Sequence, residues 1–236
     1  MISSIPKWVS NLFGNTMLPN VKVLETHYIS PYIKKIRFQG DISKWSFQIG
    51  YSSVIRVSDT EYRNYTVAYH DIEKGFFDII LHIHGKGVGS TFLNNLNIGD
   101  EIFISPPRGK NFYDPSVKKQ IVFGDETSLG LACSLLPVLK QNQHQFQFYF
   151  ELDEENKNVP ELLGLENYTV FNKNGLFRNE KRIIDLPIIQ TSEWQTANFT
   201  ITGNVKSVQT FRKVLKNKTK GKFYSQGYWL EGKKGL

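Results

Sequence analysis

The segment Arg63-Asn64-Tyr65-Thr66 places a cation, a phenol and a hydroxyl within a few residues that favour β-structure. In a strand, Arg63 and Tyr65 share one face and Thr66 points to the other, because successive side chains alternate. A guanidinium can bind phosphate oxygens, a phenol can pack on a flat ring, and a hydroxyl can reach a ring nitrogen. The segment therefore fits a diphosphate that carries a flat heteroaromatic ring. Ordinary strands also contain these residue types, which is the alternative interpretation.

A glycine-rich segment follows the apolar run 76–81. It reads His84-Gly85-Lys86-Gly87-Val88-Gly89-Ser90. We expect a strand, a turn and then a short helix over about 90–96, with Ser90 and Thr91 as its caps. Backbone N–H groups in such a segment can bind phosphate, although a simple turn between two elements is equally compatible. The segment has neither the spacing of a Walker loop nor the long helix of a dinucleotide fingerprint.

The segment 121–130 begins as an apolar strand and continues into a polar turn. Apolar residues at helical spacing predict a helix over 128–140, and Pro137 predicts a kink or an early end. Asp125 or Thr127 suits the cap of this helix. The neighbouring carboxylates of Asp125 and Glu126 are compatible with acid–base chemistry or with a purely structural role at the helix terminus.

The wider pattern changes from strands alone to strands alternating with helices. The β-rich runs 21–28, 32–38, 52–57, 62–69, 76–84 and 101–104 predict a closed antiparallel barrel. The later strands 120–123, 146–150, 168–171, 199–202 and 222–228 alternate with helices over 128–140 and 205–217 and predict a parallel sheet. We place the boundary near Asp114-Pro115, which gives domains 1–115 and 116–236.

Four motifs in this order resemble those of the siderophore-interacting proteins, which are FAD-dependent ferric-siderophore reductases of the ferredoxin reductase-like superfamily. They are Arg63-x-Tyr65-Thr66, the glycine-rich segment, the segment Gly124 to Leu129, and Gly227-Tyr228-Trp229. The resemblance implies an antiparallel Greek-key FAD-binding β-barrel followed by a Rossmann-like NAD(P)-binding α/β domain with a parallel sheet. The chain departs from the family at Asn204, where glutamate is common, and at Gly130, where proline is usual.

By this resemblance, Arg63 binds the FAD pyrophosphate, Tyr65 packs on the flavin or its ribityl chain, and Thr66 approaches the hydride-accepting nitrogen. Thr127 lies where the nicotinamide docks, so Thr66 and Thr127 position the flavin chemistry. The other cofactor-binding residues expected from the resemblance are His84, Gly85, Gly87, Val88, Gly89, Ser90, Asp125 and Trp229. Lys86 and Lys110 are candidates for recruiting an anionic substrate.

The implied reaction passes electrons from NADH or NADPH through FAD to a ferric siderophore or ferric chelate and releases ferrous iron. Reduction of free flavin or of another acceptor is an alternative. A second alternative is a basic polyanion-binding module, because the net charge is +7, the pI is about 9.3, and lysines crowd the stretch 206–222. Aromatic residues are interleaved with these lysines or follow them: Phe211, Phe223, Tyr224, Tyr228 and Trp229.

The single cysteine, Cys133, excludes an internal disulfide and an iron–sulfur cluster held by cysteines of this chain. We expect no metal site, because His82 and His84 lack further ligands nearby in the sequence. Residues 1–16 form an amphipathic segment that packs on the barrel or lies on a membrane surface. No apolar run reaches the length of a membrane span, and no signal peptide is recognisable. These features predict a cytoplasmic monomer that binds no nucleic acid and does not insert stably into a membrane.

Overall fold

The computed structural model describes residues 4, 18–85, 87–216 and 218–233. The predicted amphipathic segment 1–16, apart from Ser4, and the candidate Lys86 lie outside the described residues. The chain divides into two compact units, residues up to 111 (unit 1) and residues 112–233 (unit 2), each considered separately below. Within the described ranges, no helix combines the length and the apolar character needed to cross a membrane.

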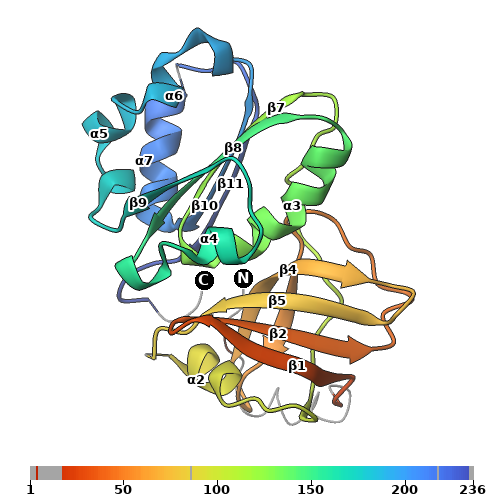
Figure 1. The fold of residues 1–236 in the computed structure, drawn as a ribbon. Helices are drawn as coiled ribbons and strands as arrows, with labels where there is room; N and C mark the ends of the chain where they lie inside the picture. The colour runs from red at the N-terminus through yellow and green to blue at the C-terminus, as the bar shows by residue number, and fades with distance from the viewer. Residues whose placement is uncertain (1–3, 5–17, 86, 217, 234–236) are drawn as a thin grey trace. The chain divides into compact units, whose positions relative to one another are not determined.

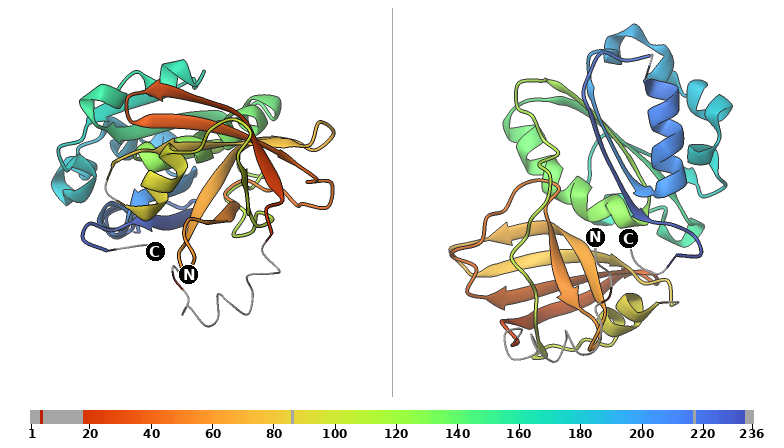
Figure 2. Two further views of the ribbon diagram at one scale, coloured as in Figure 1. Left: turned by 90° about the horizontal axis from the view of Figure 1, so that it is seen from below. Right: turned by 180° about the vertical axis from the view of Figure 1, so that it is seen from behind.

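Unit 1 is an antiparallel barrel that is nearly closed (Figures 1 and 2). Its strands are β1 (Val21–Ser30), β2 (Ile33–Gly40), β3 (Ser52–Arg56), β4 (Tyr62–Asp71), β5 (Phe76–His82) and β6 (Glu101–Ile102). They pair in the order β3-β4-β5-β2-β1-β6, a Greek-key arrangement. Two bridges, Ser52 with Arg108 and Ile55 with Ile104, join β3 to the chain that follows β6. The predicted antiparallel barrel is confirmed.

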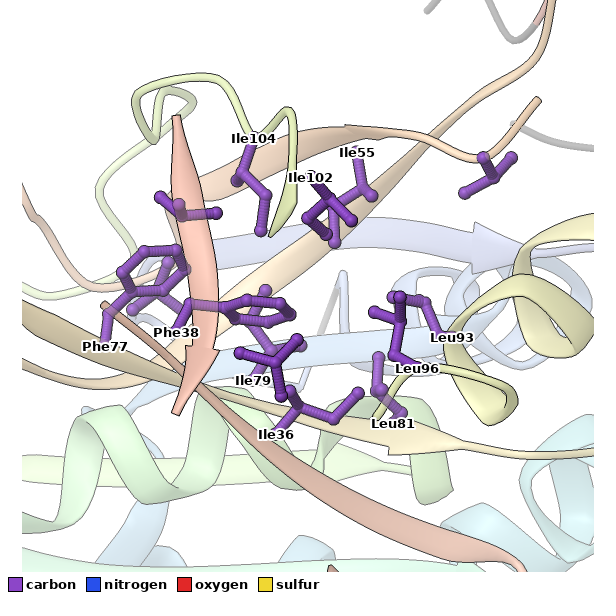
Figure 3. Close-up of a cluster of buried hydrophobic side chains, with 14 of the residues drawn as sticks. Ile36, Phe38, Ile55, Phe77, Ile79, Leu81, Leu93, Leu96, Ile102 and Ile104 are labelled. Carbon is purple, nitrogen blue, oxygen red and sulfur yellow. The ribbon is translucent and has the colours of Figure 1, made fainter. Parts of the chain in front are cut away.

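Strand alternation fills the barrel interior with large apolar side chains (Figure 3). Phe77, Ile79 and Leu81 on β5 are almost completely buried, as are the paired residues of β2. The rings of Phe38 and Phe77 stack with their centroids 5.5 Å apart. The short helix α2 (Val88–Asn94) contributes Leu93 to the same core, and this burial fixes the helix to the barrel.

Unit 2 contains a five-stranded parallel sheet with helices on both faces (Figures 1 and 2). Its strands are β7 (Lys119–Gly124), β8 (Gln145–Leu152), β9 (Tyr168–Asn172), β10 (Asn198–Asn204) and β11 (Phe223–Trp229). The spatial order is β11-β10-β7-β8-β9, as in doubly wound folds, so the predicted Rossmann-like sheet is confirmed. The helices are α3 (Leu129–Gln141), α4 (Val159–Leu162), α5 (Glu180–Ile184), α6 (Pro187–Gln190) and α7 (Val205–Leu215).

Single-turn 3₁₀ helices connect several of these elements. They are η2 (Glu126–Ser128), η3 (Glu154–Asn156), η4 (Leu176–Arg178) and η5 (Ser192–Trp194). On one face of the sheet, the ring of Phe123 contacts those of Phe211 on α7 and Phe177 on η4, with centroids 4.2 Å and 5.7 Å away. Phe211 is completely buried, so it cannot serve as an exposed stacking platform for a polyanion.

The early end predicted for the helix at Pro137 and the caps predicted for α2 are both wrong. The helix α3 continues through Pro137 to Gln141, because Leu135 and Leu139 on either side of the proline are buried in the core and this burial outweighs the lost backbone hydrogen bond. The helix α2 begins at Val88 with Gly87 as its N-cap residue, so Ser90 and Thr91 lie inside the helix and do not cap it.

Candidate functional site

In unit 1, β4 and the N-terminal end of α2 bring Arg63 and Tyr65 against Gly89. A Cβ atom added at Gly89 would lie 2.6 Å from Tyr65 Oη and 2.9 Å from Arg63 Cγ. Both contacts confirm that Arg63 and Tyr65 share a face of the strand. Glycine is needed at position 89 because of this close approach, although it is a poor helix former. The strand pairing places Thr66 next to Ser52, and alternation directs its side chain to the opposite face.

Arg63 is oriented by its own strand. Its Nη1 donates to the carbonyl oxygen of Tyr62 at 2.8 Å, and its Nη2 donates to Glu61 Oε1 at 2.9 Å. The guanidinium is therefore held in a defined position by Tyr62 and Glu61, while the aliphatic part of the Arg63 side chain lies against Gly89. Glu61 was not identified from the sequence, although a carboxylate two residues before an arginine on a strand shares its face.

Tyr65 presents a neutral phenol next to this cation. Burial raises the pKa of Tyr65 well above its usual value, and the positive charge of Arg63 only partly opposes that effect. The hydroxyl therefore stays protonated at neutral pH and can donate as well as accept a hydrogen bond.

The turn before α2 is built from the other glycine-segment residues. Gly85 has a φ of 70°, a conformation that favours glycine. The Oγ of Ser90 accepts a hydrogen bond from the backbone N–H of His84 at 3.1 Å and so closes the turn. The imidazole of His84 is exposed, lies against Gly87, and has its ring centroid 5.9 Å from that of His82. Val88 and the substrate candidate Lys110 are also exposed.

In unit 2, the order of the strands changes direction between β7 and β10, and ligands of such sheets bind at the carboxyl ends of the strands near this point. Asp125 lies there, directly after β7, and is 6% exposed. Its Oδ1 accepts from the backbone N–H of Thr127 at 3.0 Å and from the Thr127 hydroxyl at 2.5 Å. Its Oδ2 accepts from the backbone N–H of Asn204 at 2.9 Å and from the indole Nε1 of Trp229 at 2.7 Å.

The carboxylate of Asp125 thus joins the ends of β7, β10 and β11. Gly203 makes room for it: a Cβ atom there would lie 2.5 Å from Asp125 Oδ2, and the φ of 103° also favours glycine. Of the two predicted capping candidates, Asp125 is the one that caps, at the start of η2. Thr127 and Trp229, both predicted cofactor-binding residues, are brought together with Asp125 by this one carboxylate.

Glu126 has a structural role that sequence reasoning left open. It is 1% exposed, and its Oε1 accepts from the backbone N–H of Asp153, after β8, at 2.8 Å. Its Oε2 lies 2.7 Å from the Nζ of Lys173, after β9. Both oxygens are engaged in fixing neighbouring loops, which favours the structural over the acid–base interpretation.

Lys173 completes this network. Its Nζ also lies 3.1 Å from Asp153 Oδ2 and 5.6 Å from the centre of the Trp229 ring. Burial lowers the pKa of Lys173, but the charges of Glu126, Asp125 and Asp153 outweigh it, so the pKa lies above its usual value. Lys173 therefore remains charged at neutral pH.

Asn204 is a further residue of interest that was noticed only as a departure from the family pattern. It caps α7, where its Oδ1 accepts from the backbone N–H groups of Lys206 at 2.9 Å and Ser207 at 3.4 Å. Its Nδ2 is buried and has no hydrogen-bond partner in the part of the chain that the structure describes. An asparagine between a strand and an apolar helical pattern is an N-cap signal that the sequence contains.

Comparison with known proteins agrees with this description of unit 1. Residues 20–113 match the family of oxidoreductase FAD-binding domains. Among curated proteins, NADH-cytochrome b5 reductase 1 of Dictyostelium discoideum is 40% identical over 60 residues, which cover 25% of this chain and 21% of the relative. A flavohemoprotein of Candida albicans is 31% identical over 61 residues, covering 26% of this chain and 15% of that protein. The matched segments thus span about a fifth or less of these relatives.

Solved structures are similar over most of the chain. A siderophore utilization protein from T. fusca has a TM-score of 0.73 at 21% identity, covering 92% of this chain and 94% of that one. The ferredoxin reductase in carbazole 1,9a-dioxygenase has a TM-score of 0.74 at 13% identity, covering 89% and 69%. A siderophore-interacting protein from Aeromonas hydrophila has a TM-score of 0.69 at 15% identity, covering 91% and 100%.

The chain therefore has the ferredoxin reductase-like fold, and its residues 20–113 match the oxidoreductase FAD-binding domains. The predicted similarity to siderophore-interacting proteins is confirmed at the level of the fold. The residues of unit 1 also fit FAD chemically: a fixed guanidinium, a neutral phenol and a glycine whose missing Cβ lets the start of α2 approach both side chains closely.

We predict that Gly89→Ala weakens FAD binding at least about tenfold, because the new methyl group must displace Tyr65 and Arg63. Helix propensity alone favours alanine by about 0.5–1 kcal/mol, which offsets part of the stability lost through the clash. Titration of the apoprotein with FAD and a thermal melt measure the two effects. Thr91→Ala, at an exposed position two residues later in the same helix, should retain wild-type affinity; equal affinity in both variants would contradict the prediction.

We predict that Glu126→Gln lowers the free energy of unfolding by about 2 kcal/mol, because Lys173 loses a buried partner. The raised pKa of Lys173 means that this stabilisation is complete below pH 10.5 and is lost as the pH rises through the folded-state pKa. Urea unfolding between pH 7 and 11 should therefore show a smaller alkaline loss in the variant. Glu154→Gln, which removes the exposed pair with Lys157, is the matched control and should change little.

Proposed function

We propose that this protein passes electrons from NADH or NADPH through FAD to a ferric siderophore or related ferric chelate, and so releases ferrous iron. The observation that carries the proposal is the contact of Arg63, Tyr65 and Gly89 within a domain that matches FAD-binding oxidoreductases. The choice of acceptor is supported by the fold, which is similar to a siderophore utilization protein over 92% of this chain and 94% of that one.

In unit 1, Arg63 binds the diphosphate of FAD, and Glu61 keeps its guanidinium turned toward that position. The backbone N–H groups of Val88, Gly89 and Ser90, at the start of α2, would supply further donors to the same anion. Tyr65 packs on the flavin or its ribityl chain, and Thr66 approaches a ring nitrogen from the other face of the strand. When bound, FAD accepts a hydride and gives up electrons singly, and the chain supplies position and electrostatics.

In unit 2, the nicotinamide dinucleotide binds at the carboxyl ends of β7 and β10. The Thr127 hydroxyl donates its proton to Asp125, so its oxygen is left as an acceptor for the carboxamide of nicotinamide. The buried Nδ2 of Asn204 offers a donor at the start of α7. Because the indole N–H of Trp229 donates a hydrogen bond to Asp125, we assign both residues to holding the loops of this site in place and not to a reaction step.

The substrate in this proposal is anionic. The net charge of +7 favours the approach of an anionic ferric chelate; Lys86 lies within the glycine-rich segment assigned to FAD, and Lys110 follows that segment in the sequence. We propose a cytoplasmic, monomeric enzyme, because reduced pyridine nucleotides are supplied in the cytoplasm and the single cysteine is typical of a reducing compartment.

A second candidate is reduction of another acceptor, such as a haem protein. It is favoured by the local similarity of 40% identity over 60 residues to a protein named as an NADH-cytochrome b5 reductase. The polyanion-binding module has less support, because Phe211 belongs to the core and Phe223 packs against the same core.

We expect the purified protein to be yellow when loaded with FAD and to lose its absorbance at the flavin bands when NADH or NADPH is added without oxygen. Ferrous iron trapped by a chromogenic chelator should then appear with ferric siderophores. A folded protein that does not bind FAD would remove the redox assignment. Reduction of cytochromes but not of ferric siderophores would favour the second candidate.

Charge reversal at Lys86 and Lys110 should raise the KM for an anionic ferric chelate several-fold, because each substitution replaces attraction by repulsion. The KM for a neutral chelate should stay close to wild type. Steady-state kinetics with both chelates tests this, and equal effects on the two would show that these lysines do not recruit the anion.

A further inference from the structure

Lys34 occupies a position in unit 1 where a charged side chain is unexpected. On β2 it follows the same alternation as Ile36 and Phe38, both completely buried, so it belongs to the inner face of the barrel. Lys34 itself is 4% exposed, and no carboxylate pairs with it among the described residues. A buried ammonium costs free energy unless its N–H groups are all bonded, so this position requires a compensating partner.

The partner is the C-terminal end of α2. The Nζ of Lys34 donates to the carbonyl oxygens of Leu93 at 3.2 Å, Asn94 at 2.8 Å and Leu96 at 3.2 Å. The carbonyls of Leu93 and Asn94 lie in the last turn of α2, where a helix lacks internal hydrogen-bond partners and a cation is favourable, and that of Leu96 follows the helix. Three donors meeting three acceptors use the full capacity of the ammonium group.

A tyrosine from the neighbouring strand reinforces the same end of the helix. The hydroxyl of Tyr28, on β1, donates to the side-chain oxygen of Asn94. The Tyr28 ring centre lies 5.6 Å from Lys34 Nζ, within the range of a cation–π contact. The end of α2 is thus attached to β1 and β2 through polar groups as well as through Leu93.

The opposite end of this helix is the part that meets Arg63 and Tyr65. Seven residues of helix span only about 10 Å, so α2 moves as one rigid piece. A displacement of its C-terminal end therefore changes the distance between Gly89 and Arg63, which are so closely packed that no Cβ atom fits between them.

We propose that Lys34 is a positioning residue for the FAD diphosphate. By holding the C-terminal carbonyls of α2, it fixes Gly87 to Ser90 at the distance from Arg63 that the diphosphate requires. This inference rests on the proposed binding of FAD by unit 1. It differs from a purely structural role, in which Lys34 would affect stability alone.

The test compares FAD affinity in Lys34→Met, Lys35→Met and Ile79→Val, each made in the full chain. Lys35 is adjacent but pairs with Asp78 at 2.9 Å, so its replacement controls for the loss of one positive charge. Ile79 is completely buried in the same barrel, so Ile79→Val controls for lowered stability. Fluorescence titration of each apoprotein with FAD gives the affinity, and circular dichroism gives the melting temperature.

We expect Lys34→Met to weaken FAD binding at least about tenfold and the two controls to stay within about twofold of wild type. Wild-type affinity in folded Lys34→Met, or an equal loss in Ile79→Val at a similar melting temperature, overturns the inference. If Lys34→Met does not fold, Tyr28→Phe decides: a loss of about threefold supports the inference, and unchanged affinity overturns it. Failure of the wild-type protein to bind FAD would instead overturn the proposed function.

Discussion

The buried carboxylate of Asp125 is the interaction on which the arrangement of unit 2 depends. Four N–H and O–H groups converge on its two oxygens, and they come from the loop after β7, the start of α7 and the end of β11. Each of these segments lies at the carboxyl edge of the sheet, where nucleotides bind in doubly wound folds. Gly203 is constrained by the same carboxylate, because any larger residue would occupy its space. The loops are therefore preorganised by polar contacts among themselves.

In unit 1, the candidate binding segment at the start of α2 is also held in place by the rest of the unit. Its barrel is held by apolar packing, the C-terminal end of α2 is held by hydrogen bonds from Lys34, and Gly89 allows a close approach at the other end of α2. Glycine at position 89 lowers the helix propensity of α2 but allows Arg63 and Tyr65 to approach closely. Burial removes water from the ammonium of Lys34, and three carbonyl oxygens replace that water. Both costs fall on residues that set where one short helix lies. That pattern is expected of a binding segment and not of an ordinary connection between elements.

Both sheets and part of the candidate site could be predicted from the sequence, because they depend on residues that are close together in the chain. Alternation and turn residues gave both sheets, and Arg63 and Tyr65 were placed on one face from spacing alone. The pairs Lys34 with the end of α2, and Glu126 with Lys173, could not be predicted, because their partners lie 47 or more residues apart. A lysine in an alternating strand looks like an outer-face residue until the helix that covers it is known. The early end predicted at Pro137 was wrong, because burial of the neighbouring leucines outweighed the tendency of proline to end a helix.

The burial of Glu126 has a consequence for how the molecule responds to dissolved ions. Mobile ions screen exposed charges separated by more than about 8 Å at physiological ionic strength, but they act much less on pairs shielded from solvent. The bond between Glu126 and Lys173 has one fully enclosed partner, whereas Lys110 is exposed. Added salt should therefore diminish the long-range attraction of anions to the surface while leaving the loops at the sheet edge in place. Ionic strength thus changes the attraction of anions to the surface without changing the ion pair between Glu126 and Lys173.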